Sequence, residues 1–440
     1  MPQTGLPSQS SSTISLRGIQ TAEVYPADQI RYLSDSGALL DVWHDLERLS
    51  SQVSRSLFDG RVRSAPGPRV KPLTDSGVWR YRELILPVAE GQIVSRAEGN
   101  TPLYEHPCLS SWAGVDTLYL KHEGENPTGS FKDRGMTVGV TQAKIMRAKA
   151  VACASTGNTS ASLAAYAALA GIPAFIFIPA GKIAAGKLAQ ALAYGAHTLQ
   201  IEGDFDDAMA LVREVCNELG VYLLNSLNPF RLEGQKSIVF EILQGFAWQP
   251  PDWLVLPAGN LGNTAAFGKA LYEAKTLGLI DRMPRLALIQ AEGASPFYQS
   301  FLTEFSERKT MKAETVATAI RIGNPVSYER AIRTLEWTNG TVTTVTDDEI
   351  MTAKAIIDSA GIGCEPASAA SVAGTRRLVA EGTIKPHETV VGILTGNLLK
   401  DPATTVDYHT GGWPKAQFAN PPVQVEGNLA AVAKVIEGRL

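Results

Sequence analysis

The stretch K-H-E-G-E-N-P-T-G-S-F-K-D-R-G, from Lys121 to Gly135, organises the fold that we expect for this 440-residue chain. An apolar run from Thr117 to Leu120 enters it like a buried strand, and a helical pattern from Phe131 to Ala148 leaves it. The asparagine, proline and glycine residues between them are typical of a loop. The stretch is therefore predicted to be a strand-to-helix turn.

Lys132 is predicted to lie in the first turn of that helix. Ser130 and Asp133 have the spacing of an N-cap with an acidic capping box, which sets the helix start. The positive end of a helix dipole disfavours an ammonium group, so we expect Lys132 to lose its proton more readily than a free lysine. A neutral lysine beside a glycine-containing turn suits imine chemistry with a carbonyl compound. An ordinary solvated helix lysine is the alternative.

Length and composition favour a two-domain globular protein that acts on a small molecule. The chain exceeds the roughly 250–300 residues at which one hydrophobic core stops growing. Its net charge is −4, with 40 basic and 44 acidic residues well mixed, so we expect no nucleic-acid partner and no membrane partner. The four cysteines are scattered without C-x-x-C spacing, which favours a reducing cytoplasm and argues against a thiolate metal site.

The segment Ala161–Ala180 is uncharged and long enough to raise the question of a membrane span. Gly171-Ile172-Pro173 divides it into a helical part and a short strand, so we interpret it as buried core. The N-terminus has no apolar run typical of a secretory signal, although a transit peptide stays open.

Strands and helices are predicted to alternate after Lys132, which means parallel sheets covered by helices. The helices include 46–57, 204–219 with Asp204 as its cap, and one that opens with a capping box of Thr346 and Glu349. The predicted strands are 150–154, 174–178, 198–201, 221–224, 253–256, 286–290, 341–345 and 389–394.

Three polar loops follow predicted strands and should meet at one edge of the fold, where open α/β proteins bind ligands. They are A-S-T-G-N-T-S (154–160), P-A-G-N-L-G-N-T (257–264) and L-T-G-N-L-L-K-D (394–401). The first two precede helices, whose N-termini attract anions. Capped helix starts are the alternative reading, and a nucleotide would also fit the second loop, although its spacing is not G-x-G-x-x-G.

The motif P-T-G-S-F-K-D-R-G resembles the pyridoxal-phosphate lysine motif of fold type II enzymes, and specifically of the threonine synthases, in the tryptophan synthase beta-like family. Four further segments share this resemblance: 181–196, 225–236, 314–325 and 364–371. The resemblance covers the chain from about Val78 to about Asp401. It implies an α/β, two-domain fold type II enzyme with parallel-rich sheets covered by helices and a small N-terminal extension.

The resemblance also implies the cofactor, pyridoxal 5'-phosphate, and a role for each loop. Lys132 would bind the cofactor as a Schiff base, Asn158 its phenolic oxygen and Thr395 its pyridine nitrogen. Gly259, Asn260, Leu261, Gly262 and Asn263 would form the cup for the cofactor phosphate. Ser155, Thr156 and Thr159 would hold the substrate carboxylate, and Ser226 and Arg231 a substrate phosphate. An ion pair between Arg231 and Glu233 is the alternative for that arginine.

The domain division follows the same resemblance. We expect a ribbon-like N-terminal segment at 1–45, a helical arm at 46–97, a large domain at 98–135 with 232–412, a small domain at 136–231 and a C-terminal segment at 413–440. Relatives often carry cysteines where this chain has Gly18, Thr21 and Ser34. The ribbon is therefore expected to hold no metal and to be kept in place by packing.

The expected activity is that of a pyridoxal-phosphate-dependent carbon–oxygen lyase that converts O-phospho-L-homoserine and water into L-threonine and phosphate, as a homodimer. A threonine or serine dehydratase and a sulfur synthase that uses phosphoserine remain alternatives on the same scaffold. A modified phosphohomoserine could replace the substrate. A non-catalytic regulatory paralogue is the alternative from a different class, which the intact Lys132, Asn158 and Thr395 argue against.

Overall fold

The computed structural model describes residues 14–62, 70–181, 185–203 and 205–439. Within them the strands form three sheets, of three, six and four strands, which we call the N-terminal, large and small sheets. The first 13 residues of the predicted N-terminal segment and the predicted cap at Asp204 lie outside the described residues.

The large sheet has the order β12-β11-β10-β13-β5-β4. Its strands are β4 (Leu103–Glu105), β5 (Leu118–His122), β10 (Trp253–Pro257), β11 (Arg285–Ala291), β12 (Thr341–Val345) and β13 (Val390–Leu394). All neighbours are parallel except β4, an edge strand antiparallel to β5 that the sequence did not predict. The other five lie where the apolar runs predicted them.

The small sheet has the order β8-β7-β6-β9 and is parallel throughout. Its strands are β6 (Val151–Ala154), β7 (Ala174–Pro179), β8 (His197–Ile201) and β9 (Tyr222–Leu223). The segment that raised the membrane question is the helix α7 (Asn158–Ala170) followed by β7. No helix in the described part of the chain has the length and apolar character needed to cross a bilayer.

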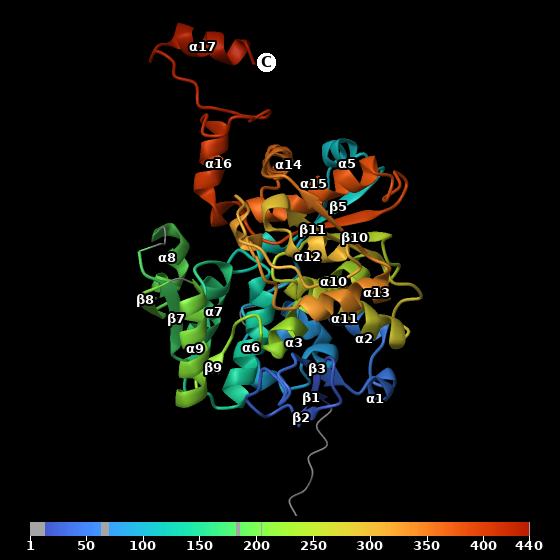
Figure 1. Ribbon diagram of the computed structural model, residues 1–440. Helices are drawn as coiled ribbons and strands as arrows, with labels where there is room; N and C mark the ends of the chain where they lie inside the picture. Colours follow the sequence, from blue (N-terminus) through green and yellow to red (C-terminus); the bar gives the residue numbers. More distant parts are fainter. Residues whose placement is uncertain (1–13, 63–69, 182–184, 204, 440) are drawn as a thin grey trace, which may run out of the picture.

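Helices cover the large sheet and the small sheet (Figure 1). Around the small sheet lie α6 (Lys132–Ile145), α7, α8 (Ala185–Ala193) and α9 (Phe205–Leu219). Around the large sheet lie α5 (Pro107–Ala113), α10 (Pro229–Gly245), α11 (Gly262–Thr276), α12 (Pro296–Phe301), α13 (Tyr328–Thr338), α14 (Asp347–Ser359) and α15 (Pro366–Ala380). The predicted capping box of Thr346 and Glu349 opens α14.

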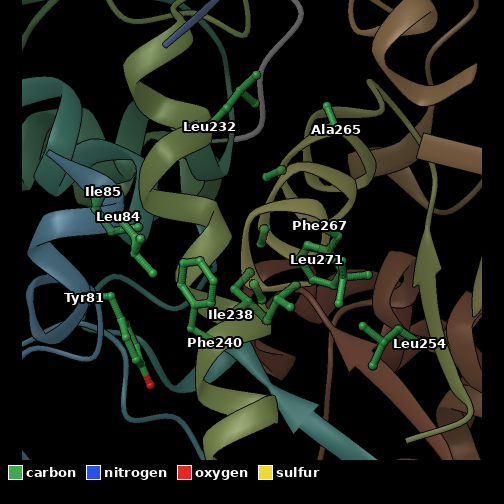
Figure 2. Close-up of a cluster of buried hydrophobic side chains, with 14 of the residues drawn as sticks. Tyr81, Leu84, Ile85, Leu232, Ile238, Phe240, Leu254, Ala265, Phe267 and Leu271 are labelled. Atoms are coloured by element: carbon green, nitrogen blue, oxygen red, sulfur yellow. The ribbon is translucent and has the colours of Figure 1, made fainter. Parts of the chain in front are cut away.

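Successive residues of the large sheet face two different cores. Leu254 and Leu256 belong to a cluster shared with α10 and α11, whereas Trp253 and Val255 pack on the side of α15. Figure 2 shows the first cluster, which includes Phe240 of α10 and Phe267 of α11. A strand buried on both faces needs a continuous apolar run, which explains why these strands were predictable.

The N-terminal sheet, in the order β2-β1-β3, is antiparallel and packs into the same cluster through Leu16, Leu40 and Val42. Its strands are β1 (Ile14–Gly18), β2 (Val24–Pro26) and β3 (Leu40–His44). The single helix predicted over 46–57 was wrong. Two short helices, α1 (Leu46–Ser50) and α2 (Arg55–Asp59), replace it, because Ser54 caps the second one.

The remaining helices connect or extend these layers. Between the N-terminal sheet and β4 lie α3 (Pro72–Asp75) and α4 (Arg82–Ile85). After β13 come α16 (Pro402–His409) and α17 (Leu429–Glu437). The last of these stands apart from the rest of the molecule and buries none of its residues (Figure 1).

Candidate active site

One cleft of about 1350 Å³ collects every residue that the sequence analysis selected. Its lining includes Lys132, Ser155, Thr156, Asn158, Thr159, Ser226, Arg231, Gly259, Asn260, Leu261, Gly262, Asn263 and Thr395. The three loops follow β6, β10 and β13, so residues from both parallel sheets face each other across this space. The convergence of the three loops, predicted from their places at strand ends, is confirmed.

Lys132 lies in the first turn of α6, as predicted, and is its first residue, but the predicted N-cap was wrong. Phe131 holds the cap position without a side-chain hydrogen bond, because Ser130 is drawn into a bridge with Gly396 of the third loop. Asp133 accepts hydrogen bonds from Thr128 and Ser162 instead of closing a capping box. The bridge between Ser130 and Gly396 therefore takes the place of a side-chain cap at the start of α6.

The pKa of Lys132 falls to about 7, from an ordinary value of 10.5. Burial is the largest cause, the charge of Arg231 lowers the pKa further, and Glu365 opposes them. The predicted direction of the shift is correct, but its main cause is burial and not the helix dipole that the sequence suggests. A large fraction of Lys132 is neutral near pH 7 and able to act as a nucleophile or base.

Glu365 joins the first and third loops and was missed by the sequence analysis. Its carboxylate accepts hydrogen bonds from Asn158 Nδ2 at 3.0 Å and from Thr395 Oγ1 at 3.2 Å. Burial raises the pKa of Glu365, and these two hydrogen bonds oppose the rise. The available signal was an acidic residue directly before Pro366, at the start of α15.

The second loop forms a tight turn at the start of α11. Leu261 has a left-handed backbone, φ 61°, and a side chain at Gly259 would come within 2.9 Å of the Ile320 backbone. The side chain of Asn260 donates to Ser226 Oγ at 3.2 Å and accepts from the Val326 backbone at 2.8 Å. The side chain of Asn260 therefore braces the loop.

Arg231 lies in the first turn of α10 with only 2% of its surface exposed. Among the described residues its Nε has no hydrogen-bond partner. The alternative of an ion pair with Glu233 was wrong, because Glu233 bonds to His44, Lys236 and Lys269. Arg231 therefore offers a buried cation to the cleft.

Arg134 anchors the helix that carries Lys132. Its guanidinium contacts Glu123 at 2.6 Å and Glu241 at 2.8 Å, and all three side chains are buried. Lys121 reaches the same Glu241 at 2.7 Å. Burial alone would lower the pKa of Arg134, but the two carboxylates outweigh it and raise the pKa.

Comparison with known proteins agrees with this geometry. The family model described as pyridoxal-phosphate dependent enzyme matches residues 94–396. The structure of threonine synthase from Escherichia coli superimposes with a TM-score of 0.66 at 20% identity, covering 97% of this chain and 100% of that one. The fold and the cleft thus define a pyridoxal-phosphate-dependent enzyme of the α/β class.

Relatives that match nearly the whole chain identify the family within this class of enzymes. Threonine synthase from Methanosarcina acetivorans is 46% identical over 427 residues, covering 96% of this chain and 99% of the relative. The protein of the same name from Methanocaldococcus jannaschii is 43% identical over 423 residues, with the same two coverages. This chain belongs to the threonine synthase family.

The residues of the cleft fit pyridoxal phosphate. Lys132 offers an amine whose pKa is lowered to about 7, and the start of α11 directs backbone N–H groups at the cleft, where they would suit an anion. Within the described part of the chain, three buried polar atoms on this side of the cleft have no hydrogen-bond partner: Arg231 Nε, Gln235 Oε1 and Asn263 Oδ1. Unpartnered buried polar atoms are costly without a ligand.

Replacing Glu365 with glutamine is expected to lower the pKa of Lys132 further, because the carboxylate of Glu365 raises it. The measurement is the pH midpoint of Lys132 reductive methylation in cofactor-free protein, read by peptide mass. Glu125→Gln is the control, since Glu125 is exposed at the rim of the cleft and should leave the midpoint in place. An unchanged or higher midpoint in Glu365→Gln would contradict the expectation.

Proposed function

We propose that this chain converts O-phospho-L-homoserine and water into L-threonine and phosphate. The single observation that carries the proposal is that Lys132 and the buried Arg231 line the same cleft, and that their charges act on each other. An amine that can give up its proton near pH 7 suits proton transfer at carbon, and a buried guanidinium suits a phosphate monoester. Membership of the threonine synthase family supports the same reaction.

Pyridoxal phosphate, when bound, supplies the electron sink of the reaction. Lys132, Asn158 and Thr395 would hold it, and the turn from Gly259 to Asn263 would hold its phosphate. Thr395 is a neutral hydroxyl, so it does not enforce a protonated pyridine nitrogen as a carboxylate would. A pyridine ring that is not protonated withdraws electrons from the substrate less strongly.

The chain's own groups would orient the substrate and move its protons. Ser155, Thr156 and Thr159 lie at the start of α7 and would hold the carboxylate, while Arg231 and Ser226 would hold the phosphate. The Lys132 amine would remove the proton from Cα and deliver protons in later steps. Phosphate leaves from Cγ after deprotonation of Cβ, and water adds at Cβ.

The direct test is to incubate the pyridoxal-phosphate-loaded protein with O-phospho-L-homoserine and to measure phosphate and threonine together. Equal release of both is the expected result. Phosphate accompanied by 2-oxobutyrate would indicate elimination without addition of water. Turnover of L-serine, L-threonine or phosphoserine, with none of O-phospho-L-homoserine, would favour the dehydratase or the sulfur synthase instead.

Arg231→Ala is expected to lower kcat/KM for O-phospho-L-homoserine by about 10- to 100-fold, since a hydrogen bond to a charged group contributes about 1.5–3 kcal/mol. Steady-state kinetics of phosphate release would measure the change. The matched control is Arg376→Ala, because Arg376 is an exposed arginine on α15 that bonds to the Trp112 carbonyl. An unchanged kcat/KM in Arg231→Ala would contradict the proposal that O-phospho-L-homoserine is the substrate.

We further propose a cytoplasmic homodimer in which residues 136–231 form a small domain and residues 98–135 with 232–412 form a large one. The resemblance to threonine synthases supports this organisation. Sedimentation equilibrium of the loaded protein should give twice the mass of the 47.1 kDa chain. A single-chain mass across the concentration range would contradict the dimer.

A further inference from the structure

Five ionisable side chains form a cluster away from the cleft lining, where β3, α10 and α11 meet. They are His44, Glu233, Lys236, Lys269 and Glu273. His44 Nε2 lies 2.8 Å from Glu233, and Lys236 Nζ lies 2.6 Å from Glu233 and 2.6 Å from Glu273. Lys269 contacts Glu233 and also donates to the Val42 carbonyl of β3. We call this set the ion cluster.

The carboxylates of the ion cluster are compensated without a metal. His44, Glu233 and Glu273 place one ligand atom each within 4.8 Å of one another, a separation that could suit a cation. The ammonium group of Lys236 already contacts both carboxylates. It supplies the positive charge that a metal would otherwise bring.

The charges in the ion cluster balance. Burial, followed by the charge of Lys236, lowers the pKa of His44, so its imidazole is neutral at pH 7. Burial would raise the pKa of Glu233, but Lys236 and Lys269 outweigh it and hold the pKa well below its usual range. Two carboxylates therefore face two ammonium groups, and removing one partner leaves a buried charge less well compensated.

The ion cluster joins the N-terminal sheet to the two helices that begin at the proposed phosphate sites. Glu233 is two residues after Arg231 on α10. Lys269 is seven residues after Gly262, about 10 Å along α11 at 1.5 Å per residue. A shift of either helix against β3 would move Arg231 relative to the turn that ends at Asn263.

The opposite side of α10 has no freedom to absorb such a shift. A side chain at Gly234 would lie 1.8 Å from the Arg134 carbonyl of α6, and one at Gly135 would lie 3.0 Å from the Arg231 carbonyl. Helix α10 is therefore in direct backbone contact with the helix that carries Lys132. The ion cluster fixes its other side.

We propose that His44 is a positioning residue: through Glu233 and Lys269 it holds the starts of α10 and α11 so that Arg231 and the turn at Gly262–Asn263 face the same cleft. The N-terminal sheet then forms part of the scaffold of the phosphate sites, without touching a ligand. This inference rests on the proposed anion-binding roles of these two helix starts. It does not depend on which phosphorylated amino acid is the substrate.

The test measures two dissociation constants in His44→Leu: that of pyridoxal phosphate for the cofactor-free protein and that of inorganic phosphate for the loaded protein, by calorimetry. Both are expected to rise by about tenfold, a smaller change than the roughly 10²-fold loss of catalytic rate that a 1 Å misplacement can cause. His44→Gln keeps an N–H group for Glu233, so its two constants should stay within about threefold of the original values. The two dissociation constants are measured without turnover, so their values do not depend on whether O-phospho-L-homoserine is the substrate.

Leu49→Ala is the control for a purely structural effect. Leu49 is 3% exposed in α1 and packs in the same hydrophobic cluster, but its apolar side chain cannot form a hydrogen bond or ion pair with the ion cluster. It should lower Tm and leave both dissociation constants unchanged. If His44→Leu does the same, the proposal is wrong. If His44→Leu does not fold, Lys269→Met replaces it under the same criterion, with unchanged constants again overturning the proposal.

Discussion

Lys132→Ala is expected to lower kcat by at least about 10³-fold and to leave the fold intact. General acid–base catalysis alone contributes about 10²–10⁴-fold, and Lys132 is also the proposed covalent attachment point of the cofactor. Among the described residues its amine forms no close ion pair, and the buried Glu365, whose charge acts on Lys132, keeps its hydrogen bonds from Asn158 and Thr395. Phosphate release, with Tm as the measure of folding, would test both parts of this expectation.

The control for Lys132 lies on the same helix. Lys144 is exposed in the last turn of α6, so Lys144→Ala should keep full activity. Borohydride reduction of the loaded protein and peptide mapping should place the pyridoxyl group on Lys132. A pyridoxyl group on another lysine, or activity within tenfold of the original in Lys132→Ala, would contradict the assignment.

The lowered pKa of Lys132 also predicts how the stability of the cofactor-free protein depends on pH. The folded-state pKa is about 7 and the ordinary value is 10.5, so between these two values the unfolded chain binds more protons than the folded one. The free energy of unfolding should therefore rise with pH across this window. Lys132→Met should remove this contribution, and denaturant titrations at pH 7 and pH 10 of both proteins would reveal it.

Arg134→Met is expected to lower the free energy of unfolding by about 3–5 kcal/mol, the usual cost of breaking a buried ion pair from one side. The variant leaves Glu123 without its guanidinium partner and leaves Lys121 as the one charged partner of Glu241 among the described residues. Both carboxylates are buried, so water cannot replace the lost hydrogen bonds. Urea unfolding monitored by tryptophan fluorescence would measure the change.

An exposed arginine near the end of α6 provides the matched control. Arg147→Met should change the free energy of unfolding by no more than about 0.5 kcal/mol, as expected for a surface site. Adding Glu123→Gln to Arg134→Met should recover part of the loss, because it removes one of the uncompensated charges. A loss below about 1 kcal/mol in Arg134→Met would mean that water or neighbouring side chains satisfy these carboxylates.

Much of the fold was readable from periodicity because the parallel strands are buried on both faces. A run such as Trp253 to Leu256 has to be apolar throughout to serve two cores, and that leaves a signal in the sequence. The short edge strand β4 pairs on one side only and left no such run, so it was missed. The predicted helix over 46–57 failed at Ser54, because this serine caps a second helix although the helical pattern of the sequence continues past it.

The sequence by itself determined which side chains could do the chemistry. Residue types fix what a lysine, an arginine or a glycine-rich turn can bind, and strand ends bring such loops to one edge of a sheet. The motifs around Lys132, Asn158, Gly259 and Thr395 therefore identified the cleft before its geometry was known.

The tertiary structure alone decided how these side chains are tuned and held. The pKa of Lys132 falls mainly through burial and through Arg231, which lies 99 positions later in the chain. Glu365 meets Asn158 and Thr395 only across the cleft, and His44 reaches Glu233 only because β3 packs against α10 and α11. Desolvation and Coulomb energies depend on distances in space, and local sequence patterns carry no information about distances between segments that are far apart in the chain.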